Sequence, residues 1–358
     1  MANLTIQIMD VGQGDGIFVV FPDGTTMLVD YGSTKNKALV SDDSLKYFKN
    51  NTKFASENQT LDYLILTHGD IDHYNMVKSF CEKLKANVGT MLYGGLESDY
   101  NGLISGLNMS QKMRGGPAIK MLGDPKKYPS KLGTFGGAEV WLVGMNVPAA
   151  TKSETAWRKN TNSVVLQIRY AGQKVLLTGD ATIDTEQAIL DLLGKAGGLD
   201  DLKSAVWKVQ HHGSARTSVR PSWVQAVKPS FAFISSDRAG TMSDTQKTHH
   251  RLPQELCLDL IRDNTTLFQG GLHPIVSSYD PTDYADYKNP DTQAKGYTNK
   301  YAATKKVREW LGTSTKEALF TTLAEMDKVF PDKTVADAGV QYQITIKANG
   351  DIGLAVTD

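Results

Sequence analysis

Cysteine is almost missing from this chain of 358 residues. Cys81 and Cys257 are the only two, and neither belongs to a Cys-x-x-Cys pair. Disulfide frameworks and cysteine zinc sites both require more cysteines at closer spacing. The sequence therefore indicates neither of them, and a reducing compartment is the simplest setting.

The chain also lacks an excess of charge of either sign and a long apolar run. Lys plus Arg and Asp plus Glu both number 39, so no global charge draws the protein onto nucleic acid or anionic lipid. No stretch approaches the roughly 20 apolar residues of a membrane helix. Residues 1–10 alternate like a strand and lack the basic region of a signal peptide. We expect a cytoplasmic protein that makes no membrane contact.

Histidine is scarce, but its distribution is informative. Of the seven histidines, four lie in two short clusters, each directly after an apolar segment that is typical of a strand. The first cluster contains His68, Asp70, Asp72 and His73. Imidazole nitrogen mixed with carboxylate oxygen suits zinc, manganese or iron better than calcium. A polar loop with chance histidines is the alternative, and the density of ligands argues against it.

Two later stretches offer further metal ligands. Asp180 follows apolar residues 175–178 and a glycine, so it can project from a strand end and bridge two metals; alone, it would suit a helix N-cap. His211 and His212 follow a strand expected at 206–209, and their doubling suggests one ligand and one group that orients the substrate. The sequence does not decide which histidine has which role. His250 is a further catalytic candidate, with a surface position beside a helix as its alternative.

The length allows one large α/β core or two modest ones. Apolar periodicity and turn residues predict strand, loop and helix in succession around the ligand clusters. We expect an irregular excursion at residues 99–132 and a lid-like loop at 265–301. The expected strands are residues 4–9, 16–21, 27–30, 63–67, 138–143, 164–170, 175–178, 206–209, 231–235, 340–346 and 352–356. The expected helices are residues 44–50, 76–85, 185–193, 253–263, 303–311 and 315–330.

These blocks resemble the metallo-β-lactamase superfamily of hydrolases. Residues 68–73 meet its signature His-x-[His/Asp]-x-Asp-His. More narrowly, MDVGQGD, LVDYG, NSVVL, LTGD and KVQHHGS, which begin at residues 9, 28, 162, 177 and 208, resemble the hydrolase domain of ComEC-type DNA-uptake proteins. The resemblance covers about residues 1–260 and implies an α/β (α+β) fold, a four-layer αββα sandwich. Residues 1–260 would form the hydrolase domain, and 261–358 an extension of loop, two helices and closing β-hairpin packed on it.

The resemblance also implies one or two divalent transition metals, zinc or manganese. Dizinc members usually supply a histidine between the first motif and the bridging aspartate, yet none occurs between His73 and His211. In addition, Asp70 stands where the signature usually has its second histidine. We therefore expect site two to be the tighter site and site one to be weak and oxygen-rich. The implied ligands are His68, Asp70 and Asp180 in site one, and Asp72, His73, Asp180 and either His211 or His212 in site two.

The function implied by the resemblance is that of a phosphodiesterase or nuclease acting through a metal-bound hydroxide, with a nucleic acid or nucleotide as substrate. The expected catalytic residues are Asp72, His212 and His250, and the expected substrate-binding residues are Asn162, Ser163, Gly213 and Ser214. One alternative is a small-molecule hydrolase acting on a cyclic nucleotide, a phosphocholine-like ester or a lactone. Another is a metal-binding sensor without turnover. Nothing in the sequence indicates a protein partner.

Overall fold

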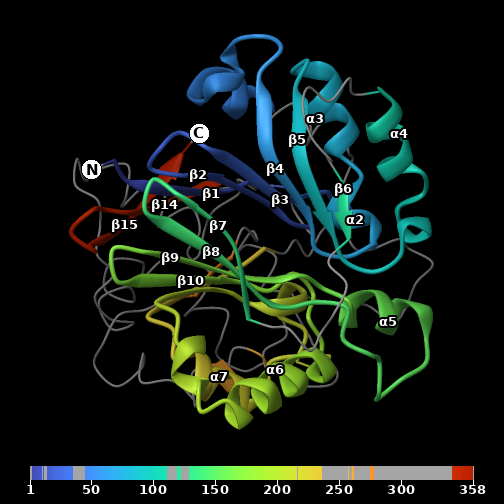
Figure 1. The fold of residues 1–358 in the computed structure, drawn as a ribbon, viewed down its shortest axis with the longest axis vertical. Coiled ribbons are helices and arrows are strands. Elements are labelled where there is room, and N and C mark those ends of the chain that lie inside the picture. Colours follow the sequence, from blue (N-terminus) through green and yellow to red (C-terminus); the bar gives the residue numbers. More distant parts are fainter. Residues whose placement is uncertain are drawn as a thin grey trace, which may run out of the picture.

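Two β-sheets stack face to face between two layers of helices in the computed structural model (Figure 1). The structure describes residues 2–9, 11, 14–34, 45–110, 119–121, 129–215, 217–235, 257, 260–261, 275–277 and 341–357. This arrangement confirms the four-layer αββα sandwich that the sequence predicts.

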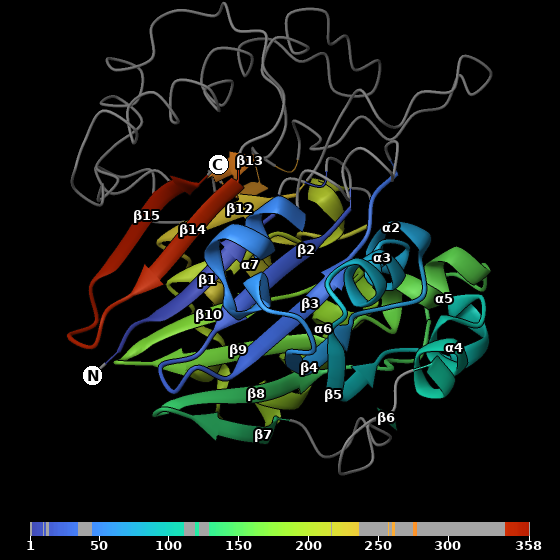
Figure 2. The same ribbon diagram turned by 90° about the horizontal axis from the view of Figure 1, so that it is seen from above.

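The first sheet joins the two ends of the described chain. Its strands β1 to β3 form an antiparallel meander, and β3 to β6 run parallel. The terminal hairpin completes this sheet, because β14 pairs with β1 from Leu4 opposite Ile346 onward (Figure 2). In spatial order the strands are β15 (Ile352–Thr357), β14 (Gln341–Ile346), β1 (Leu4–Ile8), β2 (Gly16–Val20), β3 (Thr26–Tyr31), β4 (Thr60–Leu66), β5 (Asn87–Tyr93) and β6 (Ile119–Met121).

The second sheet repeats the division into a parallel and an antiparallel half. Strands β10 to β13 are parallel, whereas β7 to β10 are antiparallel. Its spatial order is β13 (Ile275–Ser277), β12 (Phe231–Ile234), β11 (Val206–Lys208), β10 (Gln173–Leu177), β9 (Val165–Tyr170), β8 (Ala138–Gly144) and β7 (Ser130–Phe135).

Helices cover the outer faces of both sheets (Figure 1). On the first sheet lie residues 45–50, which are helical, together with η1 (Lys53–Ala55), α2 (Ile71–Tyr74), α3 (Val77–Lys83), η2 (Glu97–Tyr100) and α4 (Leu103–Ser110). The helices that connect strands β8 to β12 of the second sheet are α5 (Thr155–Thr161), α6 (Ile183–Lys195), η4 (Leu199–Leu202), η5 (Gln210–Gly213) and α7 (Pro221–Val227). Among the described residues, no helix has both the length and the apolar character needed to cross a bilayer.

Three apolar clusters hold these layers together. The central one fills the space between the sheets and includes Ile6, Val140 and Ile168, all fully buried. A second packs the first sheet against its helices around Phe48 and Phe80, and a third packs the second sheet against α6 and α7 around Trp223. Residues 175–177 of β10 are buried on both faces of the sheet, so this part of the strand is a continuous apolar run rather than an alternating one.

Most predicted elements in the described part of the chain are confirmed, including the meander, the ligand-bearing strands and the terminal hairpin. The prediction of an irregular excursion at 99–132 is wrong in part, because α4, β6 and the start of β7 lie within it. Strand β5 and helices α5 and α7 were not predicted. The lid-like loop at 265–301, apart from β13, and the helices at 303–311 and 315–330 lie outside the described residues, as does most of the helix at 253–263. The domain boundary at 260 stays a prediction.

Candidate metal centre

The predicted ligands meet at one end of the sandwich, where parallel strands of both sheets terminate. β4 leads into Thr67 and His68, β10 leads into Asp180, and β11 leads into His211 and His212. Side chains that follow the carboxyl ends of neighbouring parallel strands lie at a common edge, which is where open α/β sheets bind ligands. The two stacked sheets therefore bring three distant stretches of sequence to one point.

Asp180 is at the centre of this group. Its Oδ2 lies 3.9 Å from Nε2 of His68 and 3.4 Å from Nε2 of His73. The same oxygen lies 3.8 Å from Nε2 of His211 and 3.2 Å from Nε2 of His212. The structure thus brings together the four histidines and the aspartate that the sequence analysis selected.

The other ring nitrogen of each histidine is held by the protein. Nδ1 of His73 lies 2.8 Å from Oδ2 of Asp30, and Nδ1 of His212 lies 2.7 Å from the carbonyl oxygen of Ser235. Both partners are acceptors, so in the neutral form of each ring Nδ1 carries the proton and Nε2 presents a lone pair to the centre. Such partners orient metal-binding histidines and raise their basicity.

His68 and His211 follow the same pattern through hydroxyl groups. Nδ1 of His68 lies 3.1 Å from Oγ1 of Thr67, and the Thr67 hydroxyl donates to Asp30, so it can accept a hydrogen bond from the ring. Nδ1 of His211 lies 2.8 Å from Oγ1 of Thr217. All four rings are therefore turned with Nε2 toward Asp180.

The distances in site two fit a tetrahedral metal ion. Ligand atoms bound at about 2.0–2.1 Å to a tetrahedral zinc lie about 3.3 Å apart. Nε2 of His212 lies 3.3 Å from Nε2 of His73 and 3.5 Å from Oδ2 of Asp72. With the Asp180 distances of 3.2 and 3.4 Å, these four separations suit a single metal ion between the side chains.

Site one is looser. His68 Nε2 is fully buried and has no hydrogen-bond partner among the described residues, so it lacks the polar contact that a buried nitrogen requires. Asp70 Oδ2 lies 3.7 Å from it and Asp180 Oδ2 lies 3.9 Å from it. These spacings are longer than those in site two, and the weaker metal binding expected of site one stays a prediction.

The electrostatics of the centre favour a cation. Burial disfavours protonation of His73, but Asp180 and Asp30 outweigh it and hold the pKa of His73 well above its usual value. Burial is likewise outweighed at His212, where Asp180 and Asp72 raise the pKa to about 10. The pKa of Asp180 lies well below the usual carboxyl value, because the surrounding histidines offset its burial. The field that would attract protons to these nitrogens also attracts a divalent metal.

A buried lysine lies behind the carboxylate of Asp180. Lys208, fully buried on β11, places Nζ 2.6 Å from Oδ2 of Asp15, and it donates to the carbonyl oxygen of Gly179 at 2.7 Å. The same Nζ lies 3.5 Å from Oδ1 of Asp180. Oδ2 of Asp180 faces the histidines and Oδ1 faces the lysine, so the carboxylate has a defined orientation.

Close backbone packing shapes residues 68–73, the loop after β4 that carries His68, Asp70, Asp72 and His73 and is called the ligand loop below. A Cβ on Gly32 would lie 2.4 Å from the carbonyl carbon of Asp72, so only glycine permits the loop after β3 to touch the loop after β4. Asp30, two residues earlier, adopts a left-handed φ of 57° and directs its carboxylate under Thr67 and His73. In the block LVDYG, Asp30 therefore orients His73, and Gly32 leaves the space that the backbone of Asp72 occupies.

The double-histidine turn is also conformationally unusual. His211 and His212 both have left-handed φ values, 48° and 52°, which non-glycine residues rarely adopt. Glu186 on α6 holds the turn through hydrogen bonds from Gln210 Nε2 and from the backbone amides of Val219 and Arg220. This anchoring compensates for the backbone strain and places both rings beside Asp180.

The predicted substrate-binding residues have mostly structural contacts. The hydroxyl of Ser163 accepts the backbone N–H of Asp180 at 3.1 Å, and the backbone N–H of Ser214 donates to the His211 carbonyl at 2.9 Å. Both serines and Gly213 are buried, and the Asn162 carbonyl accepts from the backbone N–H of Asn146. Substrate contact by these four residues stays a prediction. His250 lies outside the described residues.

The sequence analysis did not select several residues on which the site depends. They are Asp15, Asp30, Lys159, Asn160, Glu186 and Lys208. Asp15, Asp30 and Lys208 lie inside the blocks that carry the family resemblance, so the blocks were a signal that these residues serve the site. The other three had no such signal, because their contacts with the site join residues from different elements.

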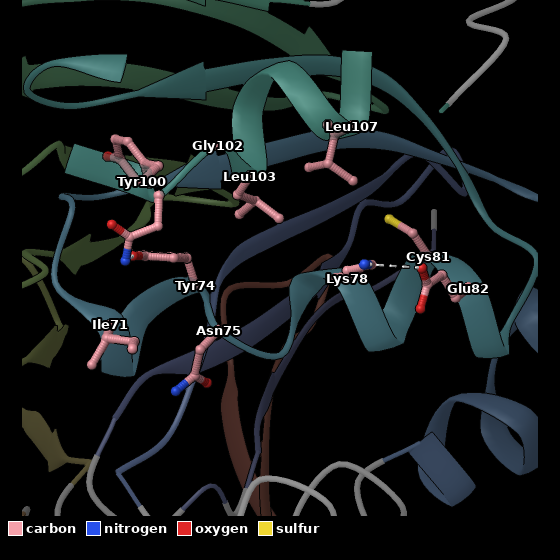
Figure 3. Close-up of a pocket in the computed structure, with 12 residues that line it drawn as sticks. Ile71, Tyr74, Asn75, Lys78, Cys81, Glu82, Tyr100, Gly102, Leu103 and Leu107 are labelled. Carbon is pink, nitrogen blue, oxygen red and sulfur yellow. Dashed lines mark hydrogen bonds and ion pairs between the residues drawn. The ribbon is translucent and has the colours of Figure 1, made fainter. Parts of the chain in front are cut away.

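A cavity of about 610 Å³ begins next to the ligand loop (Figure 3). Ile71 and Tyr74 of α2 line it, while their neighbours Asp72 and His73 belong to the metal centre. Across the cavity lie residues of η2 and α4, including Leu103 and Leu107. Its size lies within the range of pockets that bind small molecules.

Comparison with known proteins agrees with this geometry. A model of the metallo-beta-lactamase superfamily matches residues 9–221. ComE operon protein 3 of Bacillus subtilis is 24% identical over 270 residues, 72% of this chain and 30% of that protein. Recombination protein 2 of Haemophilus influenzae is 26% identical over 238 residues, 65% of this chain and 24% of that protein. The chain spans less than a third of the length of these two relatives, which support the narrower ComEC-type resemblance.

Among solved structures, the metallo-beta-lactamase fold protein YhfI from Bacillus subtilis is similar over 76% of this chain and 95% of its own, at 13% identity and a TM-score of 0.40. The family model covers more than half of the chain and includes all the convergent histidines and aspartates described above. The chain therefore belongs to the metallo-β-lactamase superfamily.

Proposed function

We propose that this protein is a metal-dependent phosphodiesterase or nuclease. The observation that carries the proposal is the convergence of four imidazole Nε2 atoms on a single oxygen of Asp180, at distances from 3.2 to 3.9 Å. Zinc or manganese bound there would activate water and neutralise negative charge in the transition state. Hydrolysis by this route requires no covalent intermediate with the protein.

The residues of the chain divide the work. Asp72, His73, Asp180 and His212 would hold the tighter ion, and His68 with Asp70 and Asp180 would provide the weaker position. His212 is the ligand of the pair, because its ring is almost fully buried among the site-two atoms. The side chain of His211 is 19% exposed, so its Nε2 can reach a bound substrate to orient it or to protonate the leaving oxygen.

An anionic substrate suits the rim of this site. Lys159 of α5 is partly exposed and lies 3.4 Å from Asp70, so an ammonium group borders the ligand loop. The resemblance to ComEC-type proteins and the name of the Haemophilus influenzae relative, Recombination protein 2, both associate the scaffold with nucleic acid. A phosphodiester in DNA, RNA or a nucleotide is therefore the substrate class that we favour.

The cavity beside α2 supports a second candidate. A space of about 610 Å³ lined by Ile71, Tyr74 and Leu103 could hold one compact ligand next to the ligand loop. A small phosphodiester, such as a cyclic nucleotide, would use such a space better than a polynucleotide would. The two candidates share the metal centre and differ in the size of the substrate.

The test is a hydrolysis screen of the metal-free protein reloaded with Zn²⁺ or Mn²⁺. The substrates are single-stranded DNA, RNA, cyclic nucleotides and bis-p-nitrophenyl phosphate. We expect turnover that chelator removes and added metal restores, and a loss of roughly 10²–10³-fold in kcat for Asp72→Ala, the range for removing one group that stabilises the transition state.

Asp191→Ala is the matched control, because Asp191 is an exposed aspartate on α6. It should retain wild-type turnover. Cleavage of the reporter and cyclic nucleotides without cleavage of polymers would favour the small-substrate candidate. Absence of hydrolysis of every phosphodiester with either metal would contradict both.

A further inference from the structure

Lys159 occupies an unusual place beside site one. It lies near the end of α5, where its Nζ donates to the carbonyl oxygen of Gly69 at 2.9 Å and lies 3.4 Å from Oδ1 of Asp70. The side chain is 22% exposed. One ammonium group thus contacts the ligand loop at two consecutive residues.

The position of Lys159 is fixed by its surroundings. Its neighbour Arg158 forms a two-point ion pair with Asp99, at 3.0 and 2.7 Å. Asp99 in turn packs against the ligand loop, since a Cβ on Gly69 would lie 2.3 Å from the Asp99 Cβ. Burial raises the pKa of Asp99, but its bonds to Arg158 outweigh this and lower it overall. This ionised pair holds α5 so that Lys159 stays over the loop.

The Asp70 carboxylate therefore faces two groups, Lys159 and the site-one ligand His68. Its Oδ1 faces the ammonium of Lys159, while its Oδ2 lies 3.7 Å from Nε2 of His68. A metal ion in site one would need the Asp70 carboxylate, because the described residues supply few other ligands there. An ammonium and a divalent cation held next to one carboxylate repel each other, so each weakens the binding of the other.

We propose that Lys159 acts as a built-in competitor for the second metal ion. Its ammonium holds Asp70 and supplies positive charge next to site one, so the protein binds one transition-metal ion tightly in site two and a second only weakly. This inference rests on the metal centre of the proposed function, and it is independent of which substrate is hydrolysed. It also adds a physical cause to the weakness of site one beyond its missing histidine.

The experiment counts bound metal rather than turnover. Metal-free full-length protein is titrated with Zn²⁺ by calorimetry at fixed pH in buffer without phosphate, and native mass spectrometry gives the number of ions. Lys159→Gln removes the charge and keeps a donor for the Gly69 carbonyl, Lys159→Met removes both, and Lys159→Arg keeps the charge. Lys152→Met is the control, because Lys152 is exposed and its Nζ lies over the Trp157 ring, 4.9 Å from the centroid, rather than over the ligand loop.

We expect one tight ion in the wild type, in Lys159→Arg and in Lys152→Met. In Lys159→Gln and Lys159→Met the second ion should bind at least tenfold more tightly. Adding Asp70→Asn to Lys159→Gln should abolish that gain, because the freed carboxylate is the group that receives the ion.

Two equally tight ions in the wild type would overturn the inference, as would an unchanged second ion in Lys159→Gln. If only the KM for a phosphodiester rises in Lys159→Gln while the metal count stays the same, Lys159 is a substrate contact and not a competitor. A gain of metal in a protein that hydrolyses no phosphodiester would leave this inference standing and reject the proposed substrate class.

Discussion

At the scale of single residues, the site depends on how each imidazole is turned. Asp30 receives the backbone N–H and the hydroxyl of Thr67 as well as Nδ1 of His73. One carboxylate therefore orients His73 directly and His68 through Thr67. The ligands themselves would be less well aligned without this partner.

Replacing Asp30 with asparagine tests this role. Asparagine tolerates the left-handed φ of 57° at this position, so the backbone can stay unchanged. The amide lacks the negative charge and cannot accept three hydrogen bonds through two carboxylate oxygens. We expect Zn²⁺ to bind roughly 10–100-fold more weakly, the range for such supporting partners.

The measurement for Asp30→Asn is calorimetric titration of the metal-free protein. Asp23→Asn serves as the control, since Asp23 lies in the exposed turn between β2 and β3 and accepts a bond from the Thr25 amide. Unchanged zinc affinity in Asp30→Asn, with a normal far-UV spectrum, would show that Asp30 is not needed to align the rings.

The ligand residues could be selected from the sequence, whereas the contacts that their supporting partners make could not. His68, Asp72, His73, Asp180 and the paired histidines follow apolar strands and are the residue types that bind metals. The bond between His73 and Asp30 joins residues 43 positions apart, and the approach of His212 to His73 spans 139 positions. Local patterns contain no information about such distances. The role of Asp15 as the counter-ion of Lys208 was hidden for the same reason.

At the scale of elements, the strand ends deliver the chemistry, so the pairing of β3 with β4 matters for the site. Asp62 on β4 holds β3 through bonds of 2.8 Å from the Thr26 amide and from the Thr26 hydroxyl, and Lys53 binds the same oxygen at 2.8 Å. Burial raises the pKa of Asp62, but these bonds outweigh it and lower the pKa below the usual value.

A carboxyl group with a lowered folded-state pKa stabilises the protein above its unfolded pKa and loses that contribution as the pH falls through the folded value. We therefore expect Asp62→Asn to lower the free energy of unfolding by about 1–2 kcal/mol at pH 7. The difference from wild type should be smaller at about pH 3 than at pH 7, because the contribution is lost progressively as the pH falls from the unfolded pKa of about 3.9 towards the lowered folded-state pKa.

Urea unfolding of the metal-free protein at both pH values gives this comparison, with Glu97→Gln as an exposed control. An equal loss of unfolding free energy in Asp62→Asn at neutral and acidic pH would mean that the charge of Asp62 does not strengthen its contacts with Thr26 and Lys53.

Elements with strong apolar runs were predicted, and elements held by single tertiary contacts were not. α5 has only seven residues, and its sequence TAWRKNT carries little helical pattern. It is anchored instead by Trp157, whose Nε1 donates to Asp184 of α6 at 2.8 Å. No residue of β7 is fully buried, and its sequence SKLGTF has only a weak strand pattern. The strand forms because it pairs with β8. In both cases the neighbouring element supplies what the local sequence lacks.

At the scale of the whole molecule, one buried ion pair joins the two sheets. Asp15 lies just before β2 of the first sheet, and Lys208 ends β11 of the second, with 2.6 Å between Nζ and Oδ2. Burial lowers the pKa of Lys208, but Asp15 and Asp180 outweigh it and raise it overall, so the lysine is charged.

Removing one partner of a buried pair leaves the other charge without compensation. We expect Lys208→Met to lower the free energy of unfolding of the metal-free protein by about 3–5 kcal/mol. The double variant Asp15→Asn/Lys208→Met should cost less than the single lysine variant, because it leaves no unpaired charge at Asp15. Urea denaturation of both variants and the wild type measures the difference.

Lys228→Met, at an exposed position after α7, is the control for the loss of a lysine. A double variant at least as unstable as Lys208→Met would show that Lys208 stabilises the fold through contacts other than its pair with Asp15.

The pairing of β1 with β14 has a consequence for how this protein is made. Leu4 lies opposite Ile346, so β1 has one neighbour that lies hundreds of residues later in the sequence and is synthesised long after it. Until then the edge of β1 that faces β14 has open backbone hydrogen-bonding groups, which are a template for pairing with other chains. Contacts between residues so far apart in sequence also slow folding. The nascent protein therefore passes through a long interval in which its first sheet is incomplete, and protection of that edge by a chaperone would be most useful during translation.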